Sequence, residues 1–304
     1  MDVLSDVLAV LRTGRPQSML LGHDAPWGQE FAEVPGAMGF QVILRGECWL
    51  LPPGGSEPVR LSPGDVVFRP HGRAHALVSA PGIVPEPCSA PVARPAGQEI
   101  VTLCGAYEID PVRTHPLVHD LPEWIHLAPT DELRSAVSLL TAELEQPRLG
   151  TGAAVPALLE MLLLYLLRCW YAGQPAATTG WVAALNDPVT SAALHAMHEQ
   201  PGEPWTVASL AARAGLSRAP FARRFTALVG RPPLGYLTWW RMTVAARLLR
   251  SSDATVATVA HRVGYASEFA FATAFRRHHG TAPGRYRRGL LAAGAARELV
   301  DRDR

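Results

Sequence analysis

The sequence predicts an α+β protein of two domains, with a β-sandwich or barrel in the N-terminal half and an all-α C-terminal half. Residues 38–80 hold short apolar runs separated by turn signals, a pattern typical of sandwiches and barrels. From Thr130 onward the apolar residues instead recur with helical spacing. The chain has 304 residues and is 48% hydrophobic, so each half can form a core of its own.

Alternation, proline and glycine divide the N-terminal half into strands and loops. Phe40, Val42 and Leu44 alternate with other residues up to a turn at Arg45-Gly46. Residues 81–97 contain repeated prolines, and we expect them to form a loop. Further strands are predicted at Cys48–Leu51, Val59–Leu61, Val66–Phe68 and Glu99–Ile109, followed by helices at Leu133–Glu145 and Val155–Ala172 and a linker at Gly173–Gly180.

The charge of the chain is unevenly divided between its two halves. Residues 1–180 carry 11 Arg against 19 Asp and Glu, whereas residues 181–304 carry 17 Arg against 8 Asp and Glu. The formal net charge of +1 conceals this difference. A basic half predicts a polyanionic partner, and a charged content of 18% excludes a disordered acidic or basic tail protein.

The cysteines and the N-terminal residues indicate in which cellular compartment the protein is found. Cys48, Cys88, Cys104 and Cys169 are too far apart for a paired-cysteine metal or redox motif, which argues against an extracellular disulfide framework. Asp2 and Asp6 stand where a signal peptide requires positive charge, so we predict no export and a cytoplasmic protein.

The most apolar stretch of the chain is Ala157–Ala172. Glu160 and Arg168 interrupt it and leave only Met161–Leu167 uncharged, far short of the ~20 residues that a membrane span requires. The sequence therefore predicts a buried or partner-facing helix here and no membrane partner.

The strongest pattern lies in the basic half, where a helix pair occurs twice. Each copy has a short apolar helical face, preceded by a threonine cap and followed by a glycine in the position of a left-handed turn. A serine then caps a second helix that contains two phenylalanines and ends at a glycine. The first copy comprises Thr206, Val207, Leu210, Ala211, Ala214, Gly215, Ser217, Phe221, Phe225 and Gly230, and the second comprises Thr255, Val256, Val259, Ala260, Val263, Gly264, Ser267, Phe271, Phe275 and Gly280.

A short helix, a glycine turn and a capped longer helix form the plan of a helix-turn-helix unit. Between the two copies, Leu234–Leu249 is predicted to be one continuous helix of roughly 24 Å. A rod of this length suits two recognition helices held about one DNA turn, ~34 Å, apart. Between Trp205 and Leu290 there are 14 Arg against only Asp253 and Glu268, which predicts attraction to phosphates.

These residues resemble a known family. The stretches WTVASLAARAGLSRAPFARRFTALVGRPPLGYLTWWRM and VATVAHRVGYASEFAFATAFRRHHGTAPGRYR are similar to the AraC/XylS-type DNA-binding domain, over about the last hundred residues. The resemblance implies a bacterial transcription regulator whose two helix-turn-helix units occupy successive major grooves of double-stranded DNA.

The resemblance also implies roles for individual residues. In the first recognition helix, Arg218–Val229, the groove-facing side chains are Arg218, Ala219, Ala222 and Arg223, with Ser217 and Arg224 also assigned to DNA; Arg223 matches the base-reading arginine. In the second, Glu268–His279, they are Glu268, Phe269, Ala270, Ala272 and Thr273 after Ser267, with Arg276 and Arg277 on phosphates. Arg241 is either structural or phosphate-binding. Many relatives carry Arg at the Thr273 position, so this copy departs from the pattern.

The acidic half resembles a cupin. Residues 64–75, GDVVFRPHGRAH, resemble the second cupin motif, and His75 is expected to point into the barrel. The first-motif stretch, Phe40–Glu47, contains no histidine, and one imidazole cannot hold Zn²⁺ or Fe²⁺, which require about three protein ligands. We therefore predict no metal, no cofactor and no catalytic residue.

The whole chain resembles AraC-family regulators with an N-terminal cupin sensor. This layout implies a sensor for a small molecule or for oxidation in residues 1–128, a helical dimerisation segment in 129–180 and the DNA-binding domain in 181–304. His75, Cys104 and Cys88 are the sensor candidates. It also implies a homodimer, and RNA polymerase as a partner if the protein is an activator. The stripe proposed for the dimer comprises Leu159, Leu162, Leu163, Leu166, Cys169 and Trp170, although an internal core helix explains these residues equally well.

Two other classes of protein compete with this interpretation. One is a metal-dependent cupin enzyme fused to a DNA-binding domain. This class is disfavoured because the sequence lacks the set of ligands that a metal requires. The other is a DNA-repair methyl-acceptor protein, which shares the helix-turn-helix domain. That class requires an N-terminal zinc-binding cysteine cluster and a PCHR-type acceptor motif, and the sequence contains neither.

Overall fold

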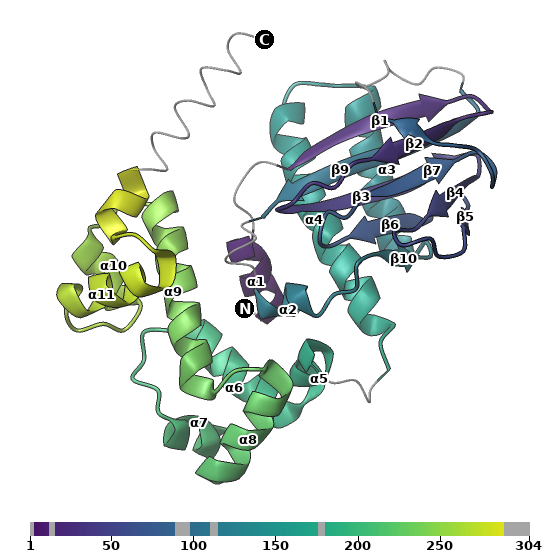
Figure 1. Cartoon of the computed structure of the whole chain (residues 1–304). Coiled ribbons are helices and arrows are strands. Elements are labelled where there is room, and N and C mark those ends of the chain that lie inside the picture. Colours follow the sequence, from purple (N-terminus) through teal and green to yellow (C-terminus); the bar gives the residue numbers. More distant parts are fainter. Residues whose placement is uncertain (1–2, 12–15, 89–97, 110–114, 176–179, 289–304) are drawn as a thin grey trace. The chain divides into compact units, whose positions relative to one another are not determined.

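The computed structural model describes residues 3–11, 16–88, 98–109, 115–175 and 180–288 (Figure 1). The chain forms two compact units, residues 11–175 and residues 1–10 together with 176–304. This division differs from the boundaries expected from the sequence in two respects. Residues 129–175 belong to the same unit as the barrel, because their helices pack on one of its sheets, and residues 1–10 belong to the C-terminal unit.

Two five-stranded sheets build the first unit (Figure 1). One has the order β1-β9-β3-β6-β10, with β1 at Gln17–His23, β3 at Ala37–Arg45, β6 at Val66–Arg69, β9 at Ile100–Glu108 and β10 at Ile125–Leu127. The other has the order β5-β4-β7-β2-β8, with β2 at Gly28–Phe31, β4 at Cys48–Leu51, β5 at Val59–Leu61, β7 at His75–Val78 and β8 at Glu86–Pro87.

The predicted strands are confirmed as β3, β4, β5, β6 and β9. Separate strands at β1, β2, β7 and β10 were not predicted from the sequence. The expected loop at 81–97 is wrong at residues 86 and 87, where β8 pairs with β2 in parallel. Pro87 is tolerated there because β8 lies at the edge of its sheet. Residues 89–97 of that expected loop lie outside the described part of the chain.

The core of this unit lies between the two sheets. Ile43 and Val67 of the first sheet pack with Leu50 and Leu77 of the second, and each is at most 1% exposed. The opposite face of the first sheet is covered by helix α3 (Asp131–Glu145) and helix α4 (Thr151–Ala172). The hydroxyl group of Tyr107 on β9 donates a hydrogen bond of 2.7 Å to the carbonyl oxygen of Leu159 on α4. A short helix, α2 (Pro116–His119), precedes β10.

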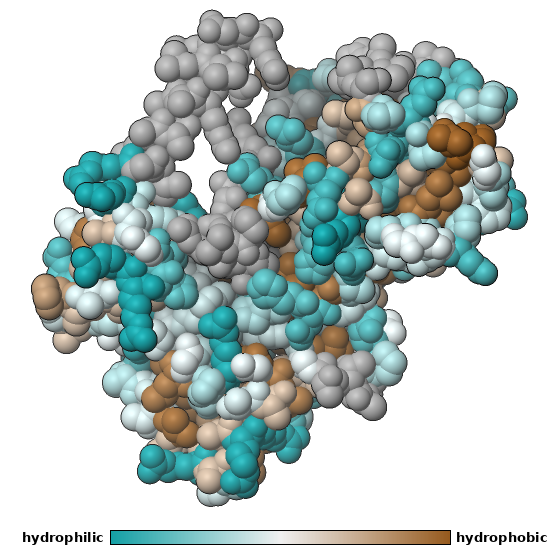
Figure 2. All heavy atoms as spheres, in the orientation of Figure 1, coloured by the Kyte–Doolittle hydropathy of each residue, from teal (hydrophilic) through white to brown (hydrophobic). Residues whose placement is uncertain are grey.

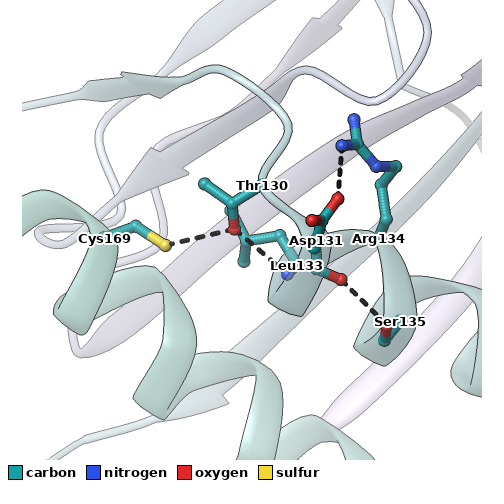
Figure 3. A network of polar contacts seen from close by, with 6 residues as sticks. All are labelled: Thr130, Asp131, Leu133, Arg134, Ser135 and Cys169. Atoms are coloured by element: carbon teal, nitrogen blue, oxygen red, sulfur yellow. Dashed lines mark hydrogen bonds and ion pairs between the residues drawn. The ribbon is translucent and has the colours of Figure 1, made fainter.

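Thr130 begins α3 and also connects it to α4 (Figure 3). Its Oγ1 accepts a hydrogen bond of 3.3 Å from the backbone N–H of Leu133, as an N-cap should. The same Oγ1 lies 3.6 Å from Sγ of Cys169 on α4. Asp131 pairs with Arg134 at 2.7 Å in the first turn. Cys169 therefore has a structural contact where α3 and α4 meet.

Helix α4 is the one helix, within the described residues, that is long and apolar enough to cross a membrane. Its leucines at 159, 162, 163 and 166 are fully buried in the core of their own unit. The stripe proposed for dimer contacts is therefore wrong for these four leucines, and the internal-core alternative is confirmed. Leu158, Met161 and Tyr165 instead remain half-buried on the outer side.

The C-terminal unit contains the predicted repeat. Helices α7 (Val207–Arg213) and α8 (Arg218–Val229) form the first helix-turn-helix, and α10 (Val256–Arg262) and α11 (Glu268–His279) form the second. Thr206, Thr255 and Ser267 cap their helices with side-chain hydrogen bonds, whereas Ser217 stands at the cap position without one. Gly215 and Gly264 have positive φ, as predicted, and so do Gly230 and Gly280, which end α8 and α11 as expected.

A single long helix, α9 (Pro233–Ser251), runs between the two units of the repeat (Figure 1). Near its start, the ring of Tyr236 lies 6.0 Å from that of Phe225 on α8. Farther along, the carbonyl oxygen of Met242 lies 3.1 Å from Nε2 of His279 on α11. Helix α9 therefore forms part of the core of both helix-turn-helix units.

The described part of this unit also contains the helices α1 (Val3–Leu11), α5 (Gly180–Asn186) and α6 (Pro188–Glu199). A buried polar chain joins α1 to α6 and α9. Nδ1 of His198 lies 3.4 Å from Oδ2 of Asp6, and its Nε2 lies 2.7 Å from the hydroxyl oxygen of Tyr236. Burial lowers the pKa of His198, which also stacks on Trp240 with 3.9 Å between ring centroids. A neutral imidazole therefore links the three helices.

We predict that Gly264→Ala destabilises the protein more than Gly215→Ala. The two glycines occupy equivalent positions with φ of +82° and +70°, so either alanine costs about 1–2 kcal/mol of backbone strain. A Cβ at position 264 would also lie 2.6 Å from the carbonyl oxygen of Gly202, whereas at position 215 nothing lies within 4 Å. Thermal unfolding of both variants measures the difference, and equal decreases in Tm would refute this packing.

Candidate nucleic-acid interface

The first recognition helix, α8, has one buried face and one exposed face. Phe221 and Phe225 are completely buried. The opposite face carries the residues that the sequence assigns to DNA. Ser217, Arg218, Ala219, Arg223 and Arg224 are exposed, and Ala222 is half-buried. The structure therefore brings the predicted groove-facing residues together on one exposed surface.

Arg223 and Arg224 are adjacent in the chain but have different surroundings. Arg224 donates through Nη2 to Oδ1 of Asp187, the residue that caps α6 by accepting a hydrogen bond of 2.8 Å from the N–H of Thr190. Burial alone would raise the pKa of Asp187, but the hydrogen bonds from Arg224 and Thr190 lower it overall. Arg223 has no ion-pair partner among the described residues. Its guanidinium is therefore free for a ligand, whereas Arg224 has a structural role between α8 and α6.

The second recognition helix, α11, is built in the same way. Phe271 and Phe275 are completely buried. Ser267, Glu268, Phe269, Ala270, Thr273, Arg276 and Arg277 are exposed, and Ala272 is half-buried. Phe269 is 83% exposed, which is unusual for a large apolar side chain. Such a side chain at the start of a recognition helix can contact the methyl group of a thymine.

Arg241, for which two roles were left open, is held inside the unit. Its Nε donates to the carbonyl oxygen of Pro201 at 2.6 Å and its Nη2 to that of Glu203 at 2.6 Å. Burial lowers its pKa. These bonds connect α9 to the turn between α6 and α7, and they favour the structural role over phosphate binding.

The surface around α7 and α8 carries both hydrophilic and hydrophobic side chains. Figure 2 shows hydrophilic side chains next to hydrophobic ones in the lower part of the view, where Figure 1 places these two helices. DNA-binding surfaces are of this mixed kind, with cationic groups for phosphates and apolar groups for base edges.

His75, the first sensor candidate, lies inside the barrel as expected. It is 5% exposed, its Nε2 lies 2.5 Å from Oε1 of Gln41, and its ring stacks on Phe31 with 4.7 Å between centroids. Burial, with Arg69 nearby, lowers the pKa of His75 to about 2, so the imidazole is neutral. Gln41 and Arg69 were not singled out from the sequence; the one available signal for Arg69 is its position inside the cupin motif.

The described residues contain no group of three or more His, Cys, Asp or Glu side chains that could hold a metal ion. Glu47, which ends the first-motif stretch, is on the surface and pairs with Arg60 at 2.5 Å. It is therefore not directed into the barrel.

The other two sensor candidates differ in exposure, since Cys104 on β9 is half-buried and Cys88, which follows β8, is exposed. Cys104 pairs with Gln41 across β9 and β3, and burial raises its pKa to about 11, with a further increase from Cys88. Sγ of Cys88 accepts a hydrogen bond of 3.0 Å from Nε2 of Gln29, and burial raises its pKa as well. Both thiols are therefore protonated at neutral pH, whereas a reactive cysteine requires the thiolate.

We predict that Arg224→Met lowers the free energy of unfolding by about 1 kcal/mol at neutral pH, because the pair is half-exposed on the arginine side. The pKa of Asp187 is lowered in the folded state, so this stabilisation is complete well above the ordinary pKa of 3.8, declines below it and is lost only as the pH falls through the lowered folded-state pKa. Chemical denaturation at pH 7 and pH 3 measures the decline, with Arg223→Met as the matched control. A difference in stability that is as large at pH 3 as at pH 7 would argue against the ion pair.

Known proteins share both halves of this chain. A family model described as a cupin matches residues 2–172, and a second, described as a helix-turn-helix domain, matches residues 210–289. A putative AraC-like transcription regulator of Streptomyces lividans is 36% identical, covering 95% of this chain and 98% of the relative. Another from Streptomyces antibioticus is 34% identical, covering 95% and 99%.

Among solved structures, the DNA-binding domain of AdpA, a global transcriptional factor in complex with a target DNA, is 39% identical. It covers 35% of this chain and 96% of that chain, with a TM-score of 0.34. The relatives are named as transcription regulators, which supports a non-enzymatic regulator over the two alternatives. The chain therefore belongs to the AraC-type family of DNA-binding transcription regulators with an N-terminal cupin domain.

Proposed function

We propose that this regulator reads its operator with both recognition helices as a homodimer, and that a ligand in the cupin domain controls the binding. The observation that supports this most strongly is that α8 and α11 are both exposed while their phenylalanines anchor them to units that share α9. A helix held in this way keeps its outer side chains in a fixed position, which specific base contacts require.

The two recognition helices offer different chemistry to DNA. In α8, Arg223 bonds O6 and N7 of a guanine, and Arg218 neutralises a phosphate. In α11, Phe269 contacts a thymine methyl group, and Arg276 and Arg277 bind phosphates. Ser217, Ala219, Ala222, Ser267, Glu268, Ala270, Ala272 and Thr273 complete the two surfaces. We assign sequence reading mainly to α8, since α11 carries Thr273 where many relatives have arginine.

Dimerisation through α4 fits its incomplete burial. Only 28% of its most apolar window is buried inside the unit. Leu158 and Met161 are half-buried and one turn apart on the outer side, together with Tyr165. Pairing this stripe with its symmetry mate would remove it from water, and a twofold dimer would match a palindromic operator. A cytoplasmic location follows from this role, as does contact with RNA polymerase if the protein activates transcription.

A small molecule explains the sensor better than oxidation does. The raised pKa of both Cys104 and Cys88 opposes attack on an oxidant by the thiolate. A ligand that binds one arrangement of the two domains more tightly shifts the fraction of protein able to occupy DNA. Footprints with and without reductant separate control by oxidation from control by a small molecule. An unchanged footprint would exclude oxidation as the signal.

Arg223→Ala tests the base-reading role. We expect the affinity for the operator to fall by about 1–3 kcal/mol and discrimination to relax at one base pair, because one bidentate contact is lost. Arg277→Ala should instead weaken binding to all sequences alike and reduce the dependence on salt. Gel-shift titrations against single-base operator variants measure both effects. If Arg223→Ala weakens every sequence equally, the residue contacts phosphate and the assignment is wrong.

A further inference from the structure

An open trough lies between helix α3 and one end of the first sheet, whose outer face α3 covers (Figure 1). Its volume is about 640 Å³, and pockets that bind small ligands measure roughly 300–1,000 Å³. All of its described lining residues belong to the first unit. On α3 the lining extends from Leu133 to Glu145, about 18 Å of helix at 1.5 Å per residue. This α3 trough is therefore elongated and large enough for a small molecule.

The floor of the α3 trough is aliphatic. Ile43 belongs to the core between the two sheets, so the preceding residue on β3, Val42, points to the opposite side, toward α3. Val101 of β9 contributes from the same sheet, and Leu133 and Val137 contribute from the helix. These four lining residues are at most 8% exposed. A hydrocarbon chain that lies on them is removed from water.

A β-bulge directs an arginine to this trough. The register between β3 and β9 shifts between Ile43 and Arg45, so that two residues, Leu44 and Arg45, stand opposite Val101. In a regular strand Arg45 would point to the same side as Ile43, into the core. The extra residue lets it line the trough instead.

The guanidinium of Arg45 is held in place but keeps its charge available. Its Nη2 donates to the carbonyl oxygen of Gln98 at 2.5 Å. No ion pair joins Arg45 to any residue in the part of the chain that the structure describes, and its side chain is exposed. The remaining N–H groups can therefore bind an anion that arrives from solution, and a guanidinium binds a carboxylate through two parallel hydrogen bonds.

The charge of the lining favours an anion. Arg45 and Arg134 are cationic, and Glu145, the last residue of α3, is the one acidic residue among the described lining residues. Arg134 pairs with Asp131 outside the lining (Figure 3), but the side chain of Asp131 is 94% exposed, so this pair is weak. An anionic head group gains more from the two arginines than it loses to one glutamate.

The lining also contains an unpartnered hydroxyl group. Thr141 lies on α3, where a threonine side chain commonly bonds the carbonyl oxygen four residues earlier. Its Oγ1 is buried and has no hydrogen-bond partner among the described residues. It therefore provides a second donor for an oxygen atom of a ligand.

We propose that the α3 trough binds an aliphatic monocarboxylate of medium chain length, with its chain on the floor and its carboxylate on Arg45, and that this class of amphiphile is the effector of the regulator. The effector role rests on the proposed function, whereas binding in the trough does not. Helix α3 meets α4 where Oγ1 of Thr130 lies 3.6 Å from Sγ of Cys169. A chain beneath α3 would therefore act on the helix that carries the proposed dimer stripe.

Titration calorimetry of the full chain with hexanoate, octanoate and decanoate, each below its micelle concentration, tests the inference. The affinity should rise about three- to fourfold with each added CH₂ group, because each group is buried on the apolar floor. Octanamide has the same length without the charge. It should bind about tenfold more weakly than octanoate, because the charge-assisted hydrogen bonds to Arg45 are lost.

Variants locate the site. Arg45→Met should bind octanoate as weakly as octanamide, whereas Arg60→Met, an exposed arginine of the same domain outside the lining, should bind it as the wild type does. Ala142→Trp should abolish binding of every chain, since it fills the trough from the exposed side of α3. Leu139→Trp is its control, because Leu139 is exposed on the same helix but does not line the trough. Glu145→Gln should tighten octanoate and leave octanamide unchanged.

Any of four results would overturn the inference. They are no binding of any of the three carboxylates, equal affinities for octanoate and octanamide, an undiminished affinity for octanoate in Arg45→Met, and undiminished binding in Ala142→Trp. The last result would place the chain elsewhere on the protein.

The effector role has its own measurement. The footprint of the wild-type protein without carboxylate tests the proposed function alone, and its absence would contradict the regulator and leave the trough site intact. With a footprint, octanoate at concentrations that saturate the calorimetric site should change the affinity for the operator, and Arg45→Met should not respond. Calorimetric binding without a change in operator affinity would refute the effector role.

Discussion

Helix α9 contributes to the hydrophobic cores of both helix-turn-helix units, and the separation of the two recognition helices depends on this shared packing. Tyr236 packs against Phe225 of the first unit, and Met242 bonds His279 of the second. Because both contacts are made by one helix, α8 and α11 cannot change their spacing without breaking a core. Rigid spacing is also what reading two successive major grooves requires.

The arginines of this protein show how burial and pairing decide function. Arg241 and Arg224 resemble phosphate-binding residues in the sequence, yet each has a partner inside its own unit and stabilises the fold. Arg223 is exposed and unpaired within the described residues, which suits a residue that meets DNA. Arg69 is buried and has no ion-pair partner among the described residues, which costs stability.

Local patterns made much of the C-terminal unit predictable. Caps, positive-φ glycines and paired phenylalanines are short-range signals, so the bounds of α8 and α11 agree with the sequence prediction to the residue. The partners of Arg224 and Arg241 were not predictable, because Asp187 and Pro201 come close only after folding. The contact between Gln41 and His75 was not predictable for the same reason. The strands β2, β7 and β8 are too short to show a recognisable periodicity in the sequence. In α4, an apolar stripe alone could not distinguish core from interface.

The most direct test of this account is hydroxyl-radical footprinting of the full-length protein on its strongest genomic site. Two exposed recognition helices fixed to one rod predict two protected segments on the same face of the duplex, about one helical turn or ~34 Å apart, both weakened by salt. Protection of a single groove would show that only one unit reads DNA. Uniform protection without sequence preference would show that the basic half merely coats phosphates, which would contradict the account.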